Sequence, residues 1–387
     1  MTILCERRNQ PIVSVFVSVK QGAGNENLSQ KGISHFVEHM LFKGTKRRTS
    51  KELSSEIERT GGMINGGTDI QNTLFYLKAP SKYLELGIDI LSDMIQNPKF
   101  SSLDIEKERK IIFEEIKMMH DIPSAYVVRK LTELLYAPPF GDPIIGNFET
   151  LSKISKQNLI SLHSTYIPKN LIVCVVGNAS IGQVQELAER KFNIKNNNSK
   201  ILMPKIRKIS MNVIEKRQNL DQAHLAIGFH MPSAIEASTY AAQIFDSILA
   251  QGMSSKINQE IREKRALAYS VDGVYESGKD YGMEMIYAGT LPNKIRLAKE
   301  LILKEVNKMK NLNLREFNET KEKLIGNFEL SREKSTDVAR NLIADELGLG
   351  AEEYYNFIKK ISAVKLNDAR KIAKNIKNFS SIILLPK

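Results

Sequence analysis

Residues 32–45 read Gly-Ile-Ser-His-Phe-Val-Glu-His-Met-Leu-Phe-Lys-Gly-Thr. On a helix, where successive residues are about 100° apart, His35, Glu38 and His39 share one face. Two imidazoles on one face can bind a single metal ion, and the glutamate lies beside them. Packing alone does not require two histidines and a glutamate on a shared face, so a metal site explains them better than a core of hydrogen-bonded histidines.

The order of these residues indicates a chemistry. The carboxylate comes directly before the second histidine, as in the zinc-binding HxxEH motif of inverzincin-type metallopeptidases. In such a site Glu38 is the general base for the water that the metal activates. The helix is predicted to begin with Ser34 as its N-cap and to end at Gly44.

A zinc site of this kind needs a third protein ligand. Residues 101–120 are predicted to form a long helix, with Ser101 and Asp104 spaced as a capping box. Glu108 and Glu115 are almost two helical turns apart and can point the same way, but spacing alone does not select the ligand. Its apolar residues include Leu103, Ile111, Ile112, Ile116 and Met119, and its acids include Glu106, Glu108, Glu114 and Glu115.

Residues 32–45 and 105–115 resemble the pitrilysin family of zinc peptidases, and most closely its branch of mitochondrial processing peptidases and their bacterial relatives. The family's third ligand is a glutamate 76 residues after the motif, and Glu115 stands 76 residues after His39. The family's assisting glutamate, seven residues earlier, matches Glu108, which would orient the ligands. The resemblance therefore implies one zinc ion per chain. Its ligands would be His35, His39 and Glu115, with Glu38 as the catalytic residue.

The resemblance extends to residues that bind substrate. Gly61-Gly-Met-Ile-Asn65, followed by Thr68, is similar to a family segment that accepts a peptide at a sheet edge, and Asn65 would hold a substrate carbonyl. Arg262 and Tyr269, seven residues apart, match the family's arginine and tyrosine donors to an oxyanion. Without the resemblance, these segments would be a glycine-rich turn, a charged helix end and a strand aromatic.

Two positions depart from the family pattern. Gly66 stands where the family usually has alanine, and the smaller residue would loosen this edge of the sheet. Asp142 stands where the family commonly has arginine, which removes the basis for assigning that loop a role.

The chain also contains an internal repeat. Residues 36–44 are matched 208 residues later by Ile244-Phe-Asp-Ser-Ile-Leu-Ala-Gln-Gly252, and Lys153-Ile-Ser recurs 207 residues later as Lys360-Ile-Ser. Duplication followed by loss of the metal is the simplest account, so the second half is expected to keep the fold without zinc. The second copy has Gln243, Asp246 and Ser247 in place of the HxxEH residues.

The length of 387 residues agrees with two domains that can each bury a full core. We predict an N-terminal zinc-binding catalytic domain at residues 1–195 and a homologous C-terminal domain at residues 201–387, joined by polar residues 193–200. The predicted fold class is α+β, each domain a mixed β-sheet covered by helices, with a repeat of about 207 residues. Strands are predicted at 12–19 and 171–176, and helices at 51–59 and 183–191.

Composition narrows the compartment and the partners. With two cysteines, Cys5 and Cys174, a disulfide framework is not expected and a reducing cytoplasm is. No segment approaches the roughly 18 apolar residues of a membrane span. The 56 basic and 44 acidic residues leave a charge of +12, but lysines are scattered over polar helix faces, so nucleic acid is not an expected partner.

The resemblance also implies an assembly. Because one chain carries both the metal motif and the Arg262/Tyr269 pair, it implies a homodimer whose clamshell chamber admits peptides and unfolded, presequence-like segments. Each site would be completed by the partner's second domain. A different class of function stays open, since some family members are non-catalytic assembly subunits with a degraded zinc motif. The intact motif of this chain favours the peptidase.

Overall fold

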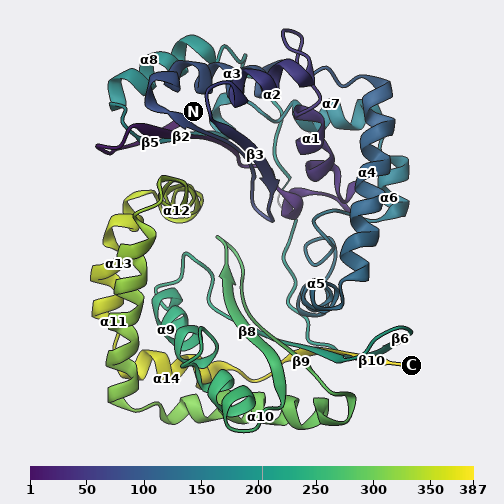
Figure 1. Cartoon of the computed structure of the whole chain (residues 1–387), viewed down its shortest axis with the longest axis vertical. Helices are drawn as coiled ribbons and strands as arrows, with labels where there is room; N and C mark the ends of the chain where they lie inside the picture. The colour runs from purple at the N-terminus through teal and green to yellow at the C-terminus, as the bar shows by residue number, and fades with distance from the viewer. Residues whose placement is uncertain (203) are drawn as a thin grey trace. The chain divides into compact units, whose positions relative to one another are not determined.

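The structure, a computed structural model, describes residues 1–202 and 204–387 and divides into two compact units (Figure 1). The first unit comprises Met1–Lys117, Asp142–Lys205 and Ser331–Glu352. The second comprises Met118–Gly141, Ile206–Leu330 and Glu353–Lys387. Each unit is built on one five-stranded sheet.

The sheet of the first unit is mixed and has the order β1-β5-β2-β4-β3. Strands β1 and β5 pair in parallel, and the other neighbours pair antiparallel. Strand β3 therefore lies at one edge of the sheet and pairs with β4. The strands are β1 (Thr2–Arg7), β2 (Ile12–Val19), β3 (Met63–Thr68), β4 (Thr73–Pro80) and β5 (Leu171–Gly177).

The sheet of the second unit repeats this topology strand for strand, in the order β6-β10-β7-β9-β8. Again one pair is parallel, β6 with β10, and β8 takes the edge position that β3 has in the first sheet. The predicted α+β class with two repeated mixed sheets is confirmed. The strands are β6 (Asn212–Arg217), β7 (Ala223–His230), β8 (Ala268–Ser277), β9 (Gly282–Thr290) and β10 (Ser380–Pro386).

Helices cover both sheets. Among the described residues, none forms a helix long and apolar enough to cross a membrane. The first unit holds α1 (Ile33–Leu41), α2 (Ser50–Glu58), α3 (Leu84–Gln96), most of α4 (Ser102–Asp121), α6 (Phe148–Lys153), α7 (Lys156–His163), α8 (Ile181–Lys191) and α12 (Ser335–Gly348). The second holds α5 (Pro123–Leu135), α9 (Thr239–Leu249), α10 (Ile295–Lys308), α11 (Leu314–Ser331), α13 (Glu352–Ala363) and α14 (Leu366–Asn375).

One helix of each unit comes from the other half of the sequence. Helix α12 packs on β2 and β5, where the buried hydroxyls of Ser14 and Ser335 lie 2.9 Å apart. Helix α5 packs on β7 and β10 of the second sheet, and both helices can be followed by colour in Figure 1. The compact units are therefore discontinuous in sequence. An amphipathic pattern shows that a helix is half-buried but not which sheet it covers.

The helix that carries the metal motif begins differently from the prediction. Its N-cap is Gly32, at φ 90°, and Ser34 is buried in the first turn. The backbone N–H groups of Gly32 and Ser34 donate to the buried carboxylate of Glu26, at 2.9 and 2.7 Å. A side chain at Gly32 would meet the Ile145 carbonyl oxygen at 2.5 Å from its Cβ. An acid six residues upstream thus replaces the expected serine cap.

Helix α4 starts as predicted, since the Asp104 N–H donates to Ser101 Oγ at 3.1 Å. Its apolar face is narrower than predicted. Ile112 and Ile116 are buried, whereas Leu103 and Ile111 are 67% and 47% exposed. The helix packs through one side only, and its other side faces water.

Candidate metal centre

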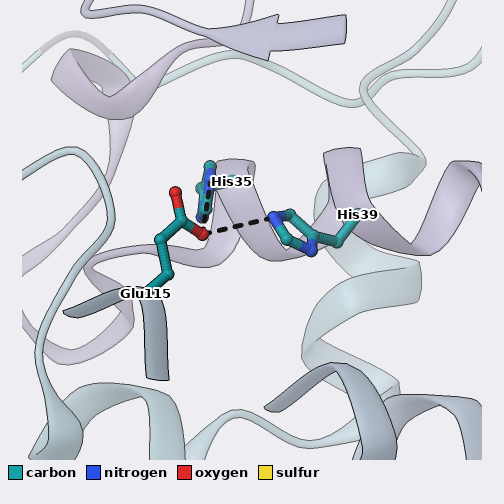
Figure 2. Close-up of side chains that lie close together, drawn as sticks. All are labelled: His35, His39 and Glu115. Atoms are coloured by element: carbon teal, nitrogen blue, oxygen red, sulfur yellow. Dashed lines mark ion pairs between the residues drawn. The ribbon is translucent and has the colours of Figure 1, made fainter. Parts of the chain in front are cut away.

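Helices α1 and α4 bring His35, His39 and Glu115 together (Figure 2). Glu115 Oε2 lies 3.9 Å from His35 Nε2 and 3.7 Å from His39 Nε2. One ligand atom from each residue lies within 4.8 Å of the other two. The motif on α1 and an acid 76 residues later therefore meet at one point.

These residues fit a zinc ion. Bonds of about 2.0–2.1 Å in a tetrahedral site place ligand atoms roughly 3.3 Å apart, close to the spacing of these three side chains. Burial, with the neighbouring charge of His39, lowers the pKa of His35 to about 3. A neutral imidazole keeps the lone pair that a metal requires. Two imidazoles and one carboxylate form a known catalytic zinc set, which leaves a fourth position open.

Glu108 contacts one side chain of α1, His39, and one just after its end, Lys43. Its Oε2 lies 3.1 Å from His39 Nδ1, and its Oε1 lies 2.8 Å from Lys43 Nζ. Burial opposes ionisation, but the hydrogen bonds from His39 and Lys43 prevail and lower the pKa of Glu108. With Nδ1 donating to Glu108, the lone pair of His39 is on Nε2, which faces Glu115.

Lys43 was not among the predicted site residues. A sequence signal existed, because Lys43 follows His39 by four residues and so lies about one helical turn further on the same side. Of the two histidines, only His39 has a partner at Nδ1 within the described residues. The corresponding nitrogen of His35 is buried without one.

Glu38 is buried beside the ligand cluster, with 8% of its surface exposed. Its Oε2 accepts a hydrogen bond from Thr68 Oγ1 at 2.8 Å. Burial raises the pKa of Glu38, and the hydrogen bond from Thr68 partly offsets this effect. A carboxylate with a raised pKa is a better proton acceptor near neutral pH than an exposed one.

A groove of about 520 Å³ opens directly beside these residues. It runs from Glu38 and His39 to the edge strand β3 and helix α2. Asn65 is an exposed residue of β3 in this groove, and its Oδ1 accepts the Gly66 N–H at 2.8 Å. The lining includes Glu38, His39, Phe42, Met63, Asn65 and Glu108.

Gly66, which departs from the family pattern, faces Glu38. A Cβ at this position would lie 3.0 Å from the Phe42 ring and 3.3 Å from Glu38 Oε1. Strand β3 still pairs with β4 from Met63 to Thr68. The missing methyl group therefore leaves space at the carboxylate while the strand stays regular.

Arg262 and Tyr269 belong to the second compact unit, where the structure brings them together. Arg262 lies in a π-helical segment, η5 (Asn258–Glu263), and Tyr269 lies at the start of β8. The guanidinium carbon is 5.9 Å from the centre of the Tyr269 ring. Tyr269 is 87% exposed, so the pair is accessible to a ligand.

Two repeated sheets and a His-His-Glu group consistent with an HxxEH site define the class of inverted-motif zinc peptidases. Residues 2–147 match the family model described as insulinase (peptidase family M16), and residues 153–324 match the peptidase M16 inactive domain. The chain is 32% identical to an "uncharacterized zinc protease" of Rickettsia felis, over 96% of this chain and 90% of that protein. It is 29% identical to the zinc protease YmxG of Bacillus subtilis, over 94% and 90%. The chain therefore belongs to peptidase family M16, the pitrilysin and insulinase family.

Solved structures show the same fold. A protease from Helicobacter pylori superposes with a TM-score of 0.93 at 22% identity, over 99% of this chain and 97% of that one. A peptidase M16 inactive domain from Pseudomonas fluorescens superposes with a TM-score of 0.89 at 15% identity, over 100% and 95%.

Proposed function

We propose that this chain is a zinc-dependent endopeptidase of the processing-peptidase-like branch, with one zinc ion held by His35, His39 and Glu115. The observation that carries the proposal is the convergence of these three side chains beside a buried glutamate and a groove of about 520 Å³. Full-length relatives named zinc proteases support it. A metal site alone can be structural, but a structural zinc site is usually closed by four protein ligands.

When bound, zinc supplies the Lewis acidity that activates a water molecule and polarises the scissile carbonyl. Glu38 takes the proton of the attacking water and later passes it to the leaving nitrogen. Glu108 keeps His39 oriented through Nδ1, and Lys43 holds Glu108 from its other oxygen. The chain thus divides proton transfer and ligand orientation between separate carboxylates.

The substrate peptide pairs with the free edge of β3 in this proposal. Strand β4 pairs with one side of β3, and no strand formed by the described residues pairs with its other side, so the backbone groups on that side can extend the sheet with a bound peptide. Asn65 donates to a substrate carbonyl through Nδ2, while its Oδ1 keeps accepting the Gly66 N–H. Recognition through the backbone favours extended peptides and unfolded, presequence-like segments over folded proteins.

Arg262 and Tyr269 donate hydrogen bonds to the negative charge that develops on the carbonyl oxygen. Their mutual contact and exposure support this role, since both side chains can reach a ligand from one surface. We propose a homodimer in which the second unit of the partner supplies this pair. Two free cysteines are compatible with the cytoplasm as the site of action.

The test of this function is the variant Glu38→Gln. It keeps the shape of the side chain but removes the base, so bound zinc should stay at one per chain while peptide cleavage falls about 10²- to 10⁴-fold. Zinc is measured by atomic emission, and cleavage with a quenched peptide in the presence and absence of a chelator. Full cleavage by Glu38→Gln would show that the base is assigned wrongly.

The same experiments separate the remaining alternatives. A wild-type chain that holds zinc but cleaves no peptide would instead be a non-catalytic assembly subunit. An active species that elutes only as a monomer in size-exclusion chromatography would contradict the homodimer.

A further inference from the structure

The edge strand β3 lines the groove with one side and contacts the Glu38 carboxylate with the other. Its residues alternate, so that Met63, Asn65 and Gly67 are exposed while Gly66 and Thr68 turn inward. The inward pair lies against the two oxygens of the Glu38 carboxylate. Thr68 Oγ1 donates to Oε2 at 2.8 Å, and the vacant side-chain position of Gly66 is 3.3 Å from Oε1.

The hydroxyl of Thr68 is a specific anchor. Among the described residues, it is the one side-chain group that hydrogen-bonds to Glu38. A glutamate side chain has three rotatable bonds, and a buried carboxylate with one fixed oxygen loses much of that freedom. With Oε2 occupied, Oε1 is the oxygen left to accept a proton, and Gly66 leaves space beside it.

We propose that Thr68 is a positioning residue that holds the Glu38 carboxylate with Oε1 toward the attacking water. This inference rests on the proposed peptidase function. One strand thereby positions both the base and the substrate, because β3 carries Thr68 on its inner side and Asn65 in the substrate groove. A peptide docked on β3 would be in register with the oriented base.

A purely structural role for Thr68 makes a different prediction. β-branched residues favour strands through their shape, and valine has the shape of threonine without its hydroxyl. Thr68→Val therefore preserves strand packing and removes the donor, whereas Thr68→Ser preserves the donor and removes the methyl group. If only the shape matters, valine should substitute well and serine poorly.

Kinetics on the zinc-loaded full chain distinguish the two roles. We expect Thr68→Val to lower kcat about 10-fold, since misorientation of a reacting group acts on the chemical step, with KM, zinc content and thermal midpoint unchanged. Thr68→Ser should stay within about 3-fold of wild type by the same argument. In a Glu38→Gln background, Thr68→Val should add no further loss. Equal kcat for wild type and Thr68→Val, or a loss confined to KM, would overturn the proposal.

A readout without catalysis keeps this inference separate from the peptidase assignment. In metal-free protein with ¹³C-labelled glutamate, the carboxyl resonance absent from Glu38→Gln belongs to Glu38. That resonance should shift in Thr68→Val and stay near its wild-type position in Thr68→Ser. An unmoved resonance in Thr68→Val refutes the anchor even if the enzyme is active. If the resonance shifts in Thr68→Val but the wild-type chain cleaves no peptide, the anchor is supported and only the proposed function is refuted.

Discussion

Helices α1 and α9 occupy corresponding places in two sheets of the same topology, yet within the described part of the chain only α1 contributes to a group of side chains that could hold a metal. In α9, Ser247 corresponds to His39 and is 2% exposed, and Asp246 corresponds to Glu38 and is 1% exposed. Both helices are apolar on their packed faces. The difference between the units therefore lies in a few polar side chains set into a shared scaffold.

In the second unit, a lysine takes the repeat position that corresponds to Glu115. Lys323 of α11 follows Glu115 by 208 residues, the offset that relates Ile244 to Phe36. Its ammonium group donates to the carbonyl oxygens of Ser247 and Gln251, at 3.3 and 2.7 Å. The ammonium group of Lys323 thus lies at the C-terminal end of α9, where the negative partial charge of the helix accumulates.

The second unit also buries a pair of carboxyl groups. Asp246 and Glu284 lie close enough for each to act on the charge of the other, and Glu284 is fully buried. Burial raises the pKa of Asp246 to about 6, and burial together with the charge of Asp246 raises that of Glu284 well above its usual range. The comparison teaches what the neighbour of a buried acid decides. Glu108 of the first unit faces Lys43, and its pKa is lowered, whereas the two buried acids of the second unit face each other, and their pKa values are raised.

The largest effect is expected from removal of a ligand. His39→Ala should lower zinc affinity by more than the roughly 10- to 100-fold that loss of a ligand's supporting residue causes, and cleavage should disappear with it. Competition with a chromogenic chelator measures the affinity. The matched change in the repeat, Ser247→Ala, should leave zinc binding and cleavage at wild-type levels. A loss of zinc in Ser247→Ala would mean that the second unit contributes to the metal site.

The carboxyl pair predicts a pH effect on stability. Both groups have a raised pKa in the folded state, so their protonated forms stabilise the fold at acidic pH, and this stability is lost as pH rises through about 6. Glu284→Gln removes the titrating carboxyl group of Glu284 and offers an amide donor to Asp246. We expect the variant to be more stable than wild type by about 1–3 kcal/mol at pH 8.

At pH 4.5 the two proteins should unfold at similar urea concentrations when followed by circular dichroism. The difference between variant and wild type cancels the pH dependence of the metal site, which both proteins share. Tyr275 and Lys323 also face this pair, and neither is changed. A stability difference that does not vary with pH would contradict the raised pKa values of the two acids.

Removal of the lysine tests the cation of the second unit. Lys323→Met retains the aliphatic stem but loses two charge-assisted hydrogen bonds, so the free energy of unfolding should fall by about 1–2 kcal/mol. Faster hydrogen exchange at the end of α9 would localise the effect. Zinc content should not change. Unaltered exchange in α9 would show that the ammonium group does not stabilise that helix.

The smallest effect is expected on zinc affinity, from loss of the lysine that holds Glu108 against the ligand His39. Lys43→Met frees one oxygen of Glu108, and zinc affinity should fall about 10-fold because His39 is held less firmly. The repeat offers a control, since Lys256 pairs with Glu316 at 2.7 Å, and Glu316 follows Glu108 by 208 residues. Lys256→Met should leave zinc affinity unchanged. Equal losses in both variants would indicate a general effect of charge.

Much of the site was predictable because its signals are local. The spacing within residues 35–39 places three side chains on one face wherever a helix forms, and resemblance selected Glu115 and Glu108 from among four acids. The start of α1 was predicted wrongly because its cap is not local in the sequence. A serine near a helix start is a common cap, but the donor groups of this helix are satisfied by Glu26, which only the folded loop brings into reach.

By itself the sequence determined the repeat, the α+β class and the HxxEH motif, because periodicity and spacing act within a single element. Only the tertiary structure decided which sheet α5 and α12 cover, and that Lys43 and Thr68 hold Glu108 and Glu38. These contacts depend on how separate elements pack. A hydroxyl or an ammonium group has no role in a sequence until folding places an acceptor within about 3 Å of it.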